Sequence, residues 1–261
     1  MSTQAAHVDR DGAVLTLTLS RPDALNAINA DIERALGDAL STFESEPDLR
    51  VFVIRARGEY FSAGFDVEHR VDDDHDRSGV LLRRRYREIH DLFDRVERVE
   101  KPVVLAAQGP CLGGALELAA SCDIRLATTT ARFALPEIKL GVIPGSGGTS
   151  RITRLVGPAW ARWLVMLGQP VDAERALAIG LVHAVHPPER FDEEVDRFAA
   201  SIATLPHEAM ALAKLSIDLC DLLDRGSGRD VERIVNTMLM TSDDHRARVE
   251  ALKERLSRRD R

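Results

Sequence analysis

The sequence predicts an α/β core followed by a helical region. Short apolar segments alternate with helical patterns through most of the 261 residues, which is typical of an α/β protein. After about Phe191 no segment has a strand pattern, whereas Val195, Phe198 and Ile202 recur at helical spacing. We therefore divide the chain into a core over residues 1–195 and a C-terminal helical region over residues 196–261.

The expected strands are short and rich in apolar or β-branched residues. Residues 14–19 (VLTLTL) alternate apolar side chains with Thr, which indicates a half-buried strand. Residues 51–54 (VFVI) are wholly apolar, which indicates a strand covered on both faces. Three further segments complete the expected strands: 103–107, 124–127 and 184–185.

Helical patterns occupy the segments between the expected strands. They cover residues 29–43, 81–99, 114–121 and 159–167. In the C-terminal region, the run Gly226-Ser227-Gly228 is expected to break the tail before a final helix.

The composition excludes several classes of partner. The chain has 35 Lys and Arg against 42 Asp and Glu, a net charge of −7, and only 5% aromatic residues. The net charge argues against a general nucleic-acid binder but leaves room for local basic patches, and the low aromatic content removes the stacking platforms that such a protein needs. No apolar run approaches the roughly 20 residues that span a bilayer. We expect no secretory signal, and the three cysteines form no CxxC pair. These features indicate a cytoplasmic protein with reduced thiols and no membrane or nucleic-acid partner.

Residues 61–66 (FSAGFD) form the first informative motif. Gly64 permits a backbone turn that a larger residue would resist. Such a turn can direct successive N–H groups toward one anion or carbonyl. On its own, however, a segment of this kind is more often a purely structural turn.

A second motif, GPCLGGALE at residues 109–117, follows the expected strand at 103–107. Its pair Gly113-Gly114 lets the backbone approach a ligand closely and then opens a helix. Free N–H groups at a helix N-terminus stabilise negative charge. Glu117 falls in the first turn of that helix, near whatever Gly114 binds; alternatively, its carboxylate only interacts with the helix dipole.

The third motif is PEIKLGVIPGSGG at residues 136–148. The residues around Glu137 are apolar: Phe133, Leu135, Pro136 and Ile138. Such surroundings raise a carboxyl pKa, although Glu137 could also be an ordinary loop carboxylate or a cap. The glycine run at 145–148 lacks the Lys-Ser/Thr of a P-loop and the third Gly of a dinucleotide fingerprint, so we expect a tight turn before a helix.

Taken together and in this order, the three motifs resemble the crotonase (enoyl-CoA hydratase/isomerase) superfamily. Three further segments resemble it as well: RPDALNA at 21–27, CDIR at 122–125 and GLV at 180–182. The resemblance runs from about residue 10 to residue 255. It implies a crotonase-type ββα spiral core with a C-terminal helical trimerisation region, and therefore a homotrimer or a hexamer of paired trimers.

The resemblance also implies catalytic residues. In the family, two backbone N–H groups form an oxyanion hole for the thioester oxygen of an acyl-CoA, and they align with Phe65 and Gly114. Hydratases of the family add two glutamates, which align with Glu117 and Glu137. Adding water to a trans-2-enoyl-CoA needs a base at the water and an acid at C2. By analogy with the family, Glu117 acts mainly on the water and Glu137 mainly supplies the C2 proton, giving a 3-hydroxyacyl-CoA.

Coenzyme A is part of the implied substrate, so no separate cofactor and no metal are expected. The resemblance places its binding site at four residues: Leu25, Ala63, Gly64 and Asp66. Asp23 and Glu68 depart from basic residues of the family and remove positive charge that would face this polyanion. The phosphates must then be bound elsewhere, for example by Arg70 or the basic C-terminus. Phe65 is larger than the Ala frequent at that position and is expected to narrow the acyl pocket.

Other functions remain as alternatives. Within the superfamily, the chain could be an isomerase or another acyl-CoA lyase that uses one glutamate. A non-catalytic acyl-CoA-binding paralogue is disfavoured because both glutamates are retained. A serine hydrolase or a zinc enzyme lacks support, since the sequence has no GxSxG elbow, no HExxH and no paired cysteines.

Overall fold

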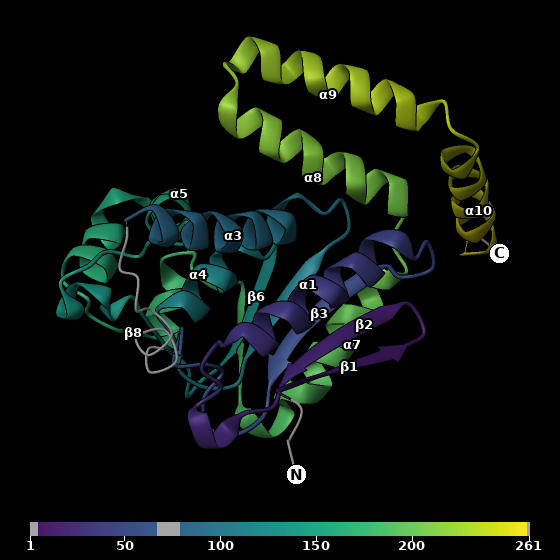
Figure 1. Ribbon diagram of the computed structural model, residues 1–261. Helices are drawn as coiled ribbons and strands as arrows, with labels where there is room; N and C mark the ends of the chain where they lie inside the picture. The colour runs from purple at the N-terminus through teal and green to yellow at the C-terminus, as the bar shows by residue number, and fades with distance from the viewer. Residues whose placement is uncertain (1–4, 67–78, 260–261) are drawn as a thin grey trace. The chain divides into compact units, whose positions relative to one another are not determined.

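The structure is a computed structural model that describes residues 5–66 and 79–259 (Figure 1). It divides into two compact units, residues 1–203 and residues 204–261. The expected boundary after residue 195 falls inside α7 (Phe191–Ala203), which packs on strands of the first unit and buries Phe191, Val195 and Ala199 there. Glu68 and Arg70 lie outside the described residues.

A six-stranded sheet forms the centre of the first unit. Its strands, in spatial order, are β1 (Ala6–Asp11), β2 (Val14–Leu19), β3 (Val51–Ala56), β4 (Val103–Ala107), β6 (Ile124–Thr128) and β9 (Ala184–His186). β1 runs antiparallel to β2, and every other pair is parallel. The five expected strands are confirmed. β1 was not expected because its sequence is largely polar, as suits a partly exposed edge strand.

A second, three-stranded sheet contains the short strands β5 (Cys111–Leu112), β7 (Arg132–Ala134) and β8 (Val171–Asp172). β5 pairs in parallel with β7, and β7 pairs antiparallel with β8. Strands of two or three residues have no readable periodicity, so the sequence did not predict them. This sheet matters for the site because β5 leads into the helix of Glu117 and β7 leads into the segment of Glu137.

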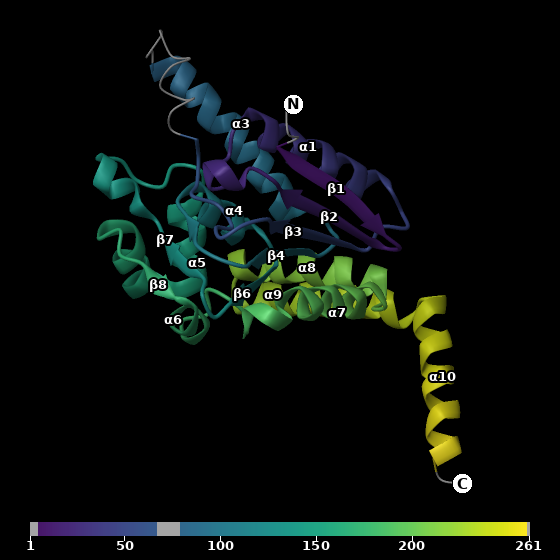
Figure 2. The same ribbon diagram turned by 90° about the horizontal axis from the view of Figure 1, so that it is seen from below.

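Helices connect and cover these strands. In the first unit they are α1 (Ala30–Ser45), α3 (Gly79–Arg98), α4 (Gly114–Ser121), α5 (Gly148–Ala161), α6 (Ala173–Ala178) and α7. Four short helical turns join them: η1 (Pro22–Ala24), η2 (Pro136–Leu140), η3 (Arg162–Met166) and η4 (Pro188–Arg190). Figure 2 shows α1 and α3 on one side of the large sheet and α7 on the other.

The expected helices at 29–43, 81–99 and 114–121 are confirmed as α1, α3 and α4. The one expected at 159–167 is not a separate helix. Helical structure starts earlier, at Gly148, is kinked where Gly157 adopts a φ of +72°, and continues through the π-helical turn η3. The kink at Gly157 explains why the sequence pattern indicates that a separate helix begins after residue 157.

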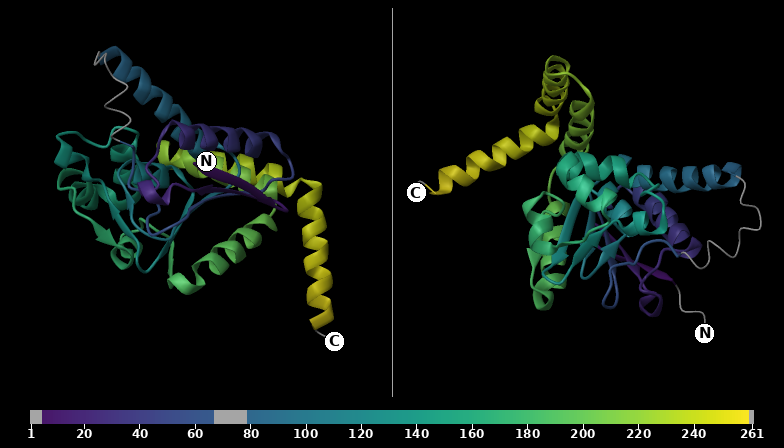
Figure 3. Two further views of the ribbon diagram at one scale, coloured as in Figure 1. Left: turned by 60° about the horizontal axis from the view of Figure 1, so that its bottom comes forward. Right: turned by 90° about the vertical axis from the view of Figure 1, so that its left-hand side faces the viewer.

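The second unit is helical throughout its described residues. It contains α8 (His207–Leu222), α9 (Arg225–Met240) and α10 (Asp243–Arg259), with α8 and α9 packed as a hairpin (Figure 3). The expected break at 226–228 is wrong, and two helices follow it rather than one. The Asp224 carboxylate accepts hydrogen bonds from the amides of Gly226, at 2.8 Å, and Ser227, so these residues form the capped first turn of α9.

A membrane-spanning helix is absent from residues 5–66 and 79–259. None of the helices in them has both the length and the hydrophobicity needed to cross a bilayer.

Candidate active site

A cavity of about 230 Å³ in the first unit brings the glycine-containing motifs together. Six predicted site residues line it: Ala63, Gly64, Phe65, Gly114, Glu117 and Glu137. They come from the turn after β3, the N-terminal turn of α4 and the turn η2. Segments more than 70 residues apart in the printed sequence therefore meet at one site.

The backbones at Gly64 and Gly114 pass each other closely. Gly64 has a φ of +97°, and a Cβ there would lie 2.8 Å from Leu112 O and 3.2 Å from Gly114 N. A Cβ on Gly114 would lie 2.3 Å from the Phe65 ring. Both positions therefore require glycine. The close approach places the amides of Phe65 and Gly114 on neighbouring stretches of backbone, and that of Gly114 is at the N-terminus of α4.

Backbone hydrogen bonds fix the turn on both sides of Phe65. The amide of Ile28 donates to Gly64 O at 2.8 Å, and the amide of Asp66 donates to Ile28 O at 2.9 Å. The Phe65 ring itself stacks on Phe93 of α3, with the ring centroids 6.2 Å apart. Phe65 forms part of the cavity wall; that its size narrows the acyl pocket stays a prediction.

Glu117 is buried at 2% exposure, and the loop before α5 holds its carboxylate. Its Oε1 accepts hydrogen bonds from the amides of Ser146, at 2.7 Å, and Gly148, at 3.0 Å. Burial raises the pKa of Glu117 above its usual value, while the two amides and the electrostatic interactions with His90 and Arg151 act to lower it. The expected turn at 145–148 is confirmed, and it also binds this carboxylate.

Glu137 lies in η2, opposite the N-terminal turn of α4. Its Oε1 would be 2.9 Å from a Cβ on Gly113, so the carboxyl approaches the backbone there. Its Oε2 is buried without a hydrogen-bond partner among the described residues. Burial is the main cause that raises the pKa of Glu137 to about 7, and the neighbouring charge of Glu117 acts in the same direction. Near neutral pH this carboxyl can hold and release a proton.

Sequence reasoning missed the remaining cavity wall. It is formed by Tyr86, Leu140, Val142, Ile143 and the backbone at Gly145 and Ser146. The sequence does contain one indication, a run of apolar residues in a loop, where polar residues are usual. In the structure, the side chains of Val142 and Ile143 in this run are 51% and 60% exposed. Tyr86 lies on α3, so this helix contributes to the cavity wall.

Leu25 and Asp66 lie outside the described cavity wall. The Leu25 carbonyl accepts a hydrogen bond from the Ala63 amide at 2.9 Å. Asp66 forms an ion pair with Arg21 at 3.0 Å, and Arg21 also donates to Ala27 O at 2.6 Å. Both residues thus support the loop next to the cavity. Their contact with coenzyme A stays a prediction.

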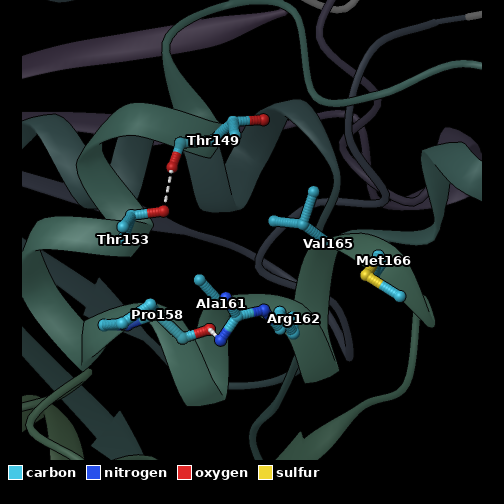
Figure 4. A pocket seen from close by; sticks show the side chains of 7 residues that line it. All are labelled: Thr149, Thr153, Pro158, Ala161, Arg162, Val165 and Met166. Carbon is cyan, nitrogen blue, oxygen red and sulfur yellow. Dashed lines mark hydrogen bonds between the residues drawn. The ribbon is translucent and has the colours of Figure 1, made fainter.

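A second pocket, also of about 230 Å³, lies between α5 and η3 (Figure 4). Its polar side chains bond to nearby backbone: Thr153 Oγ1 donates to Thr149 O at 2.8 Å, and Thr149 Oγ1 donates to Pro144 O at 3.1 Å. It therefore offers less for acid–base chemistry than the cavity with the two glutamates. Nowhere in residues 5–66 and 79–259 do three or more His, Cys, Asp or Glu side chains form a group that could hold a metal ion.

Comparisons with known proteins agree with this geometry. Residues 9–259 match the model of a family described as enoyl-CoA hydratase/isomerase. A probable enoyl-CoA hydratase of Rhizobium meliloti is 36% identical over 94% of this chain and 93% of its own, and the short-chain-enoyl-CoA hydratase of Clostridium acetobutylicum is 34% identical over 82% of each. The crystal structure of enoyl-CoA hydratase from Bacillus anthracis superposes with a TM-score of 0.90 at 30% identity, covering 97% of both chains. The predicted crotonase-type α/β fold is thereby confirmed.

Proposed function

The chain belongs to the enoyl-CoA hydratase/isomerase family, and from this premise we propose that it adds water across the double bond of a trans-2-enoyl-CoA to give a 3-hydroxyacyl-CoA. The observation that carries the proposal is the pair of carboxyls, Glu117 and Glu137, in one cavity. Their environments differ: two backbone amides bind Glu117 and favour its ionised form, whereas the pKa of Glu137 is raised to about 7. Combined base and acid catalysis requires one carboxyl of each kind.

The thioester oxygen of the substrate is proposed to lie between the amides of Phe65 and Gly114. When water attacks C3, the electron pair of the double bond moves toward the carbonyl and the oxygen becomes negative, as in an enolate. Two preorganised N–H donors stabilise this state more than the neutral thioester, and one such donor contributes about 10²–10³ in rate in other oxyanion holes. The adjacent backbones at Gly64 and Gly114 support this assignment.

Glu117 is proposed to take a proton from the attacking water. Its Oε1 is occupied by the amides of Ser146 and Gly148, so the carboxylate is fixed in orientation and Oε2 is the oxygen available to the water. The same two hydrogen bonds favour the ionised form against the effect of burial. A base needs both properties, since it must be charged and correctly placed before the reaction.

Glu137 is proposed to deliver the proton to C2 as the enolate collapses. Burial and the neighbouring carboxylate raise its pKa to about 7, so this carboxyl still carries a proton in part of the molecules near neutral pH. After one turnover Glu117 has gained a proton and Glu137 has lost one, so the pair returns to its starting state by exchange with solvent. Two carboxyls this close titrate as a coupled pair.

The coenzyme A part of the substrate is proposed to lie along Leu25 and Ala63, where the Ala63 amide is already bonded to Leu25 O. The net charge of −7 opposes a polyanionic ligand, and Asp23 on η1 adds to this effect. Backbone groups and local cations must therefore supply the binding.

We also propose that the chain forms a homotrimer or a hexamer of paired trimers. In the second unit, several large apolar side chains of α8 and α9 are more than half exposed: Ile217, Leu222, Ile234, Met238 and Met240. Apolar surface of this kind marks an interface. Light scattering coupled to size-exclusion chromatography tests this, and a monomer at assay concentration would contradict it.

The proposed reaction is tested by incubating the protein with crotonyl-CoA and following the loss of absorbance of the conjugated thioester. A C4 to C16 enoyl-CoA series then shows which acyl chains enter the cavity. Parallel incubation with 3-enoyl-CoA and 2-enoyl-CoA separates hydratase from isomerase, because only the isomerase moves the double bond without adding water. Binding of coenzyme A thioesters without turnover of any of them would replace the proposal with a non-catalytic role.

A further inference from the structure

His90 of α3 contacts the loop that holds Glu117. Its Nε2 lies 2.5 Å from Gly145 O, and since a carbonyl oxygen only accepts, Nε2 carries the proton and donates. Gly145 is followed directly by Ser146, whose amide donates to Glu117 at 2.7 Å. His90 is thus bound to the carbonyl of the same peptide unit that supplies a donor to Glu117.

A second contact fixes the next peptide of this loop. Arg151 of α5, which is 6% exposed, donates to Ser146 O at 3.3 Å. Its guanidinium is held in turn by two carboxylates of α3, Asp94 at 2.5 Å and Glu97 at 2.8 Å. His90, Asp94 and Glu97 follow each other at i, i+4 and i+7, so one face of α3 binds the loop directly and through Arg151.

The loop needs such contacts because its own backbone is permissive. Three of its four residues from 145 to 148 are glycine, and Gly147 has a φ of +91°. Glycine gains more conformational freedom than any other residue when it is released. Without an anchor at Gly145, the amides of Ser146 and Gly148 would sample positions in which they no longer meet Glu117.

We infer that His90 is a positioning residue: through the carbonyl of Gly145 it holds the Ser146 and Gly148 amides against the carboxylate of Glu117. For its kinetic consequence the inference rests on the proposed function, in which Glu117 is the base. A displacement of about 1 Å in such a group can lower a rate by about 100-fold. His90 contacts the loop and is not among the residues that line the cavity, so we expect its loss to change the turnover rate and not substrate binding.

A loosened loop also has an electrostatic consequence. The titratable or charged groups that interact with Glu117 are Glu137 from η2, His90 from α3 and Arg151 from α5. The two amide hydrogen bonds favour the ionised carboxylate, so their loss raises the pKa of Glu117. Because a base works only when ionised, the acid limb of the rate profile then moves to higher pH.

The test compares two substitutions at one position. His90→Phe keeps a ring beside Tyr86 but removes the donor, whereas His90→Gln keeps a side-chain N–H that can reach Gly145 O. His7→Phe, on the edge strand β1, is the matched control. We expect His90→Phe to lower kcat on crotonyl-CoA by about 10–100-fold with KM nearly unchanged, and to move the acid limb upward. His90→Gln and the control should stay within a few-fold of the unmodified enzyme.

Hydrogen–deuterium exchange of residues 141–152, measured without substrate, gives a readout independent of activity. We expect faster exchange in His90→Phe and unchanged exchange in His90→Gln. Unchanged kcat and exchange in His90→Phe would overturn the inference, as would an equal loss in both His90 variants, because imidazole charge or packing would then be the cause. If the unmodified protein hydrates no enoyl-CoA, the proposed function fails, while the exchange experiment still decides whether His90 holds the loop.

Discussion

Gly148 leaves the space that Glu117 occupies: a Cβ on Gly148 would lie 2.6 Å from Glu117 Cγ and 2.7 Å from its Oε1. Contacts this short are not tolerated between a Cβ and neighbouring heavy atoms. The same glycine donates its amide to that carboxylate at 3.0 Å. A single residue therefore gives Glu117 both its space and one of its hydrogen bonds.

The first prediction follows from this relationship. Gly148→Ala should displace the Glu117 carboxylate and lower kcat on crotonyl-CoA by about 100-fold, since a shift of about 1 Å in a positioned group costs that much. The substitution Gly37→Ala in α1 is the matched control, because a Cβ there meets only Leu92 Cδ1 at an ordinary 3.8 Å. Steady-state kinetics of both variants check the prediction, and equal activity of the two would contradict it.

The second prediction concerns the two carboxyls themselves. Glu117→Gln and Glu137→Gln keep the shape of each side chain but remove the base or the acid, so each should lower kcat by about 10²–10⁴. Circular dichroism should show an intact fold in both. Glu44→Gln serves as the control, since Glu44 pairs with Arg95 on the surface of α1 and α3. Full activity in either active-site variant would rule out the proposed mechanism.

How well the sequence predicts this site depends on how local each feature is. The residues of β3 and α4 themselves show a strand pattern and a helical pattern, so the positions of both elements were predictable to within a few residues. The link between Glu117 and the amides of Ser146 and Gly148 joins segments about 30 residues apart, and no periodicity encodes it. Glu117 and Glu137 were identified by resemblance to a family; their burial and the difference between their environments needed the structure.

Other features escaped the sequence for related physical reasons. β5, β7 and β8 are too short to show alternation, yet they place the two glutamate segments side by side. At 226–228 the glycines suggested a break, but the Asp224 cap satisfies the free amides and the residues enter α9. The low helix propensity of the two glycines was outweighed there by the hydrogen bonds that the Asp224 side chain accepts.

A third prediction concerns the pH dependence of kcat/KM. Glu137 must be protonated to deliver a proton, and its pKa is raised to about 7 by burial and the neighbouring Glu117. Activity should therefore fall above pH of about 7, as the free enzyme loses this proton. Because the two carboxyls are coupled, the apparent pKa of this basic limb is a property of the pair and not of Glu137 alone. Measuring kcat/KM on crotonyl-CoA from pH 5 to 9 checks this; a basic limb that persists unchanged in Glu137→Gln would assign it to another group.

The raised pKa of Glu137 should also make the stability of the protein depend on pH. Below pH of about 4.5, Glu137 is protonated in both the folded and the unfolded chain and contributes no pH dependence. Between 4.5 and about 7 the folded state binds more protons than the unfolded state, so the free energy of unfolding falls as pH rises, and above 7 the penalty is constant. Replacing this carboxyl with a neutral amide removes the penalty.

Glu137→Gln should therefore be more stable than the unmodified protein at pH 8 and nearly equal to it at pH 4.5. After discounting for solvent screening at this partly exposed side chain, we expect a gain of about 1–2 kcal/mol at pH 8. Denaturant unfolding of both proteins at the two pH values measures it, with Glu44→Gln as the surface control. If Glu137 is retained for proton transfer, its burial serves catalysis at the expense of stability. Glu137→Gln should then lose activity and, at high pH, gain stability. If Glu137→Gln and the unmodified protein are equally stable at both pH values, the Glu137 carboxyl ionises without a penalty. It would then hold no proton near neutral pH to deliver in the proposed step.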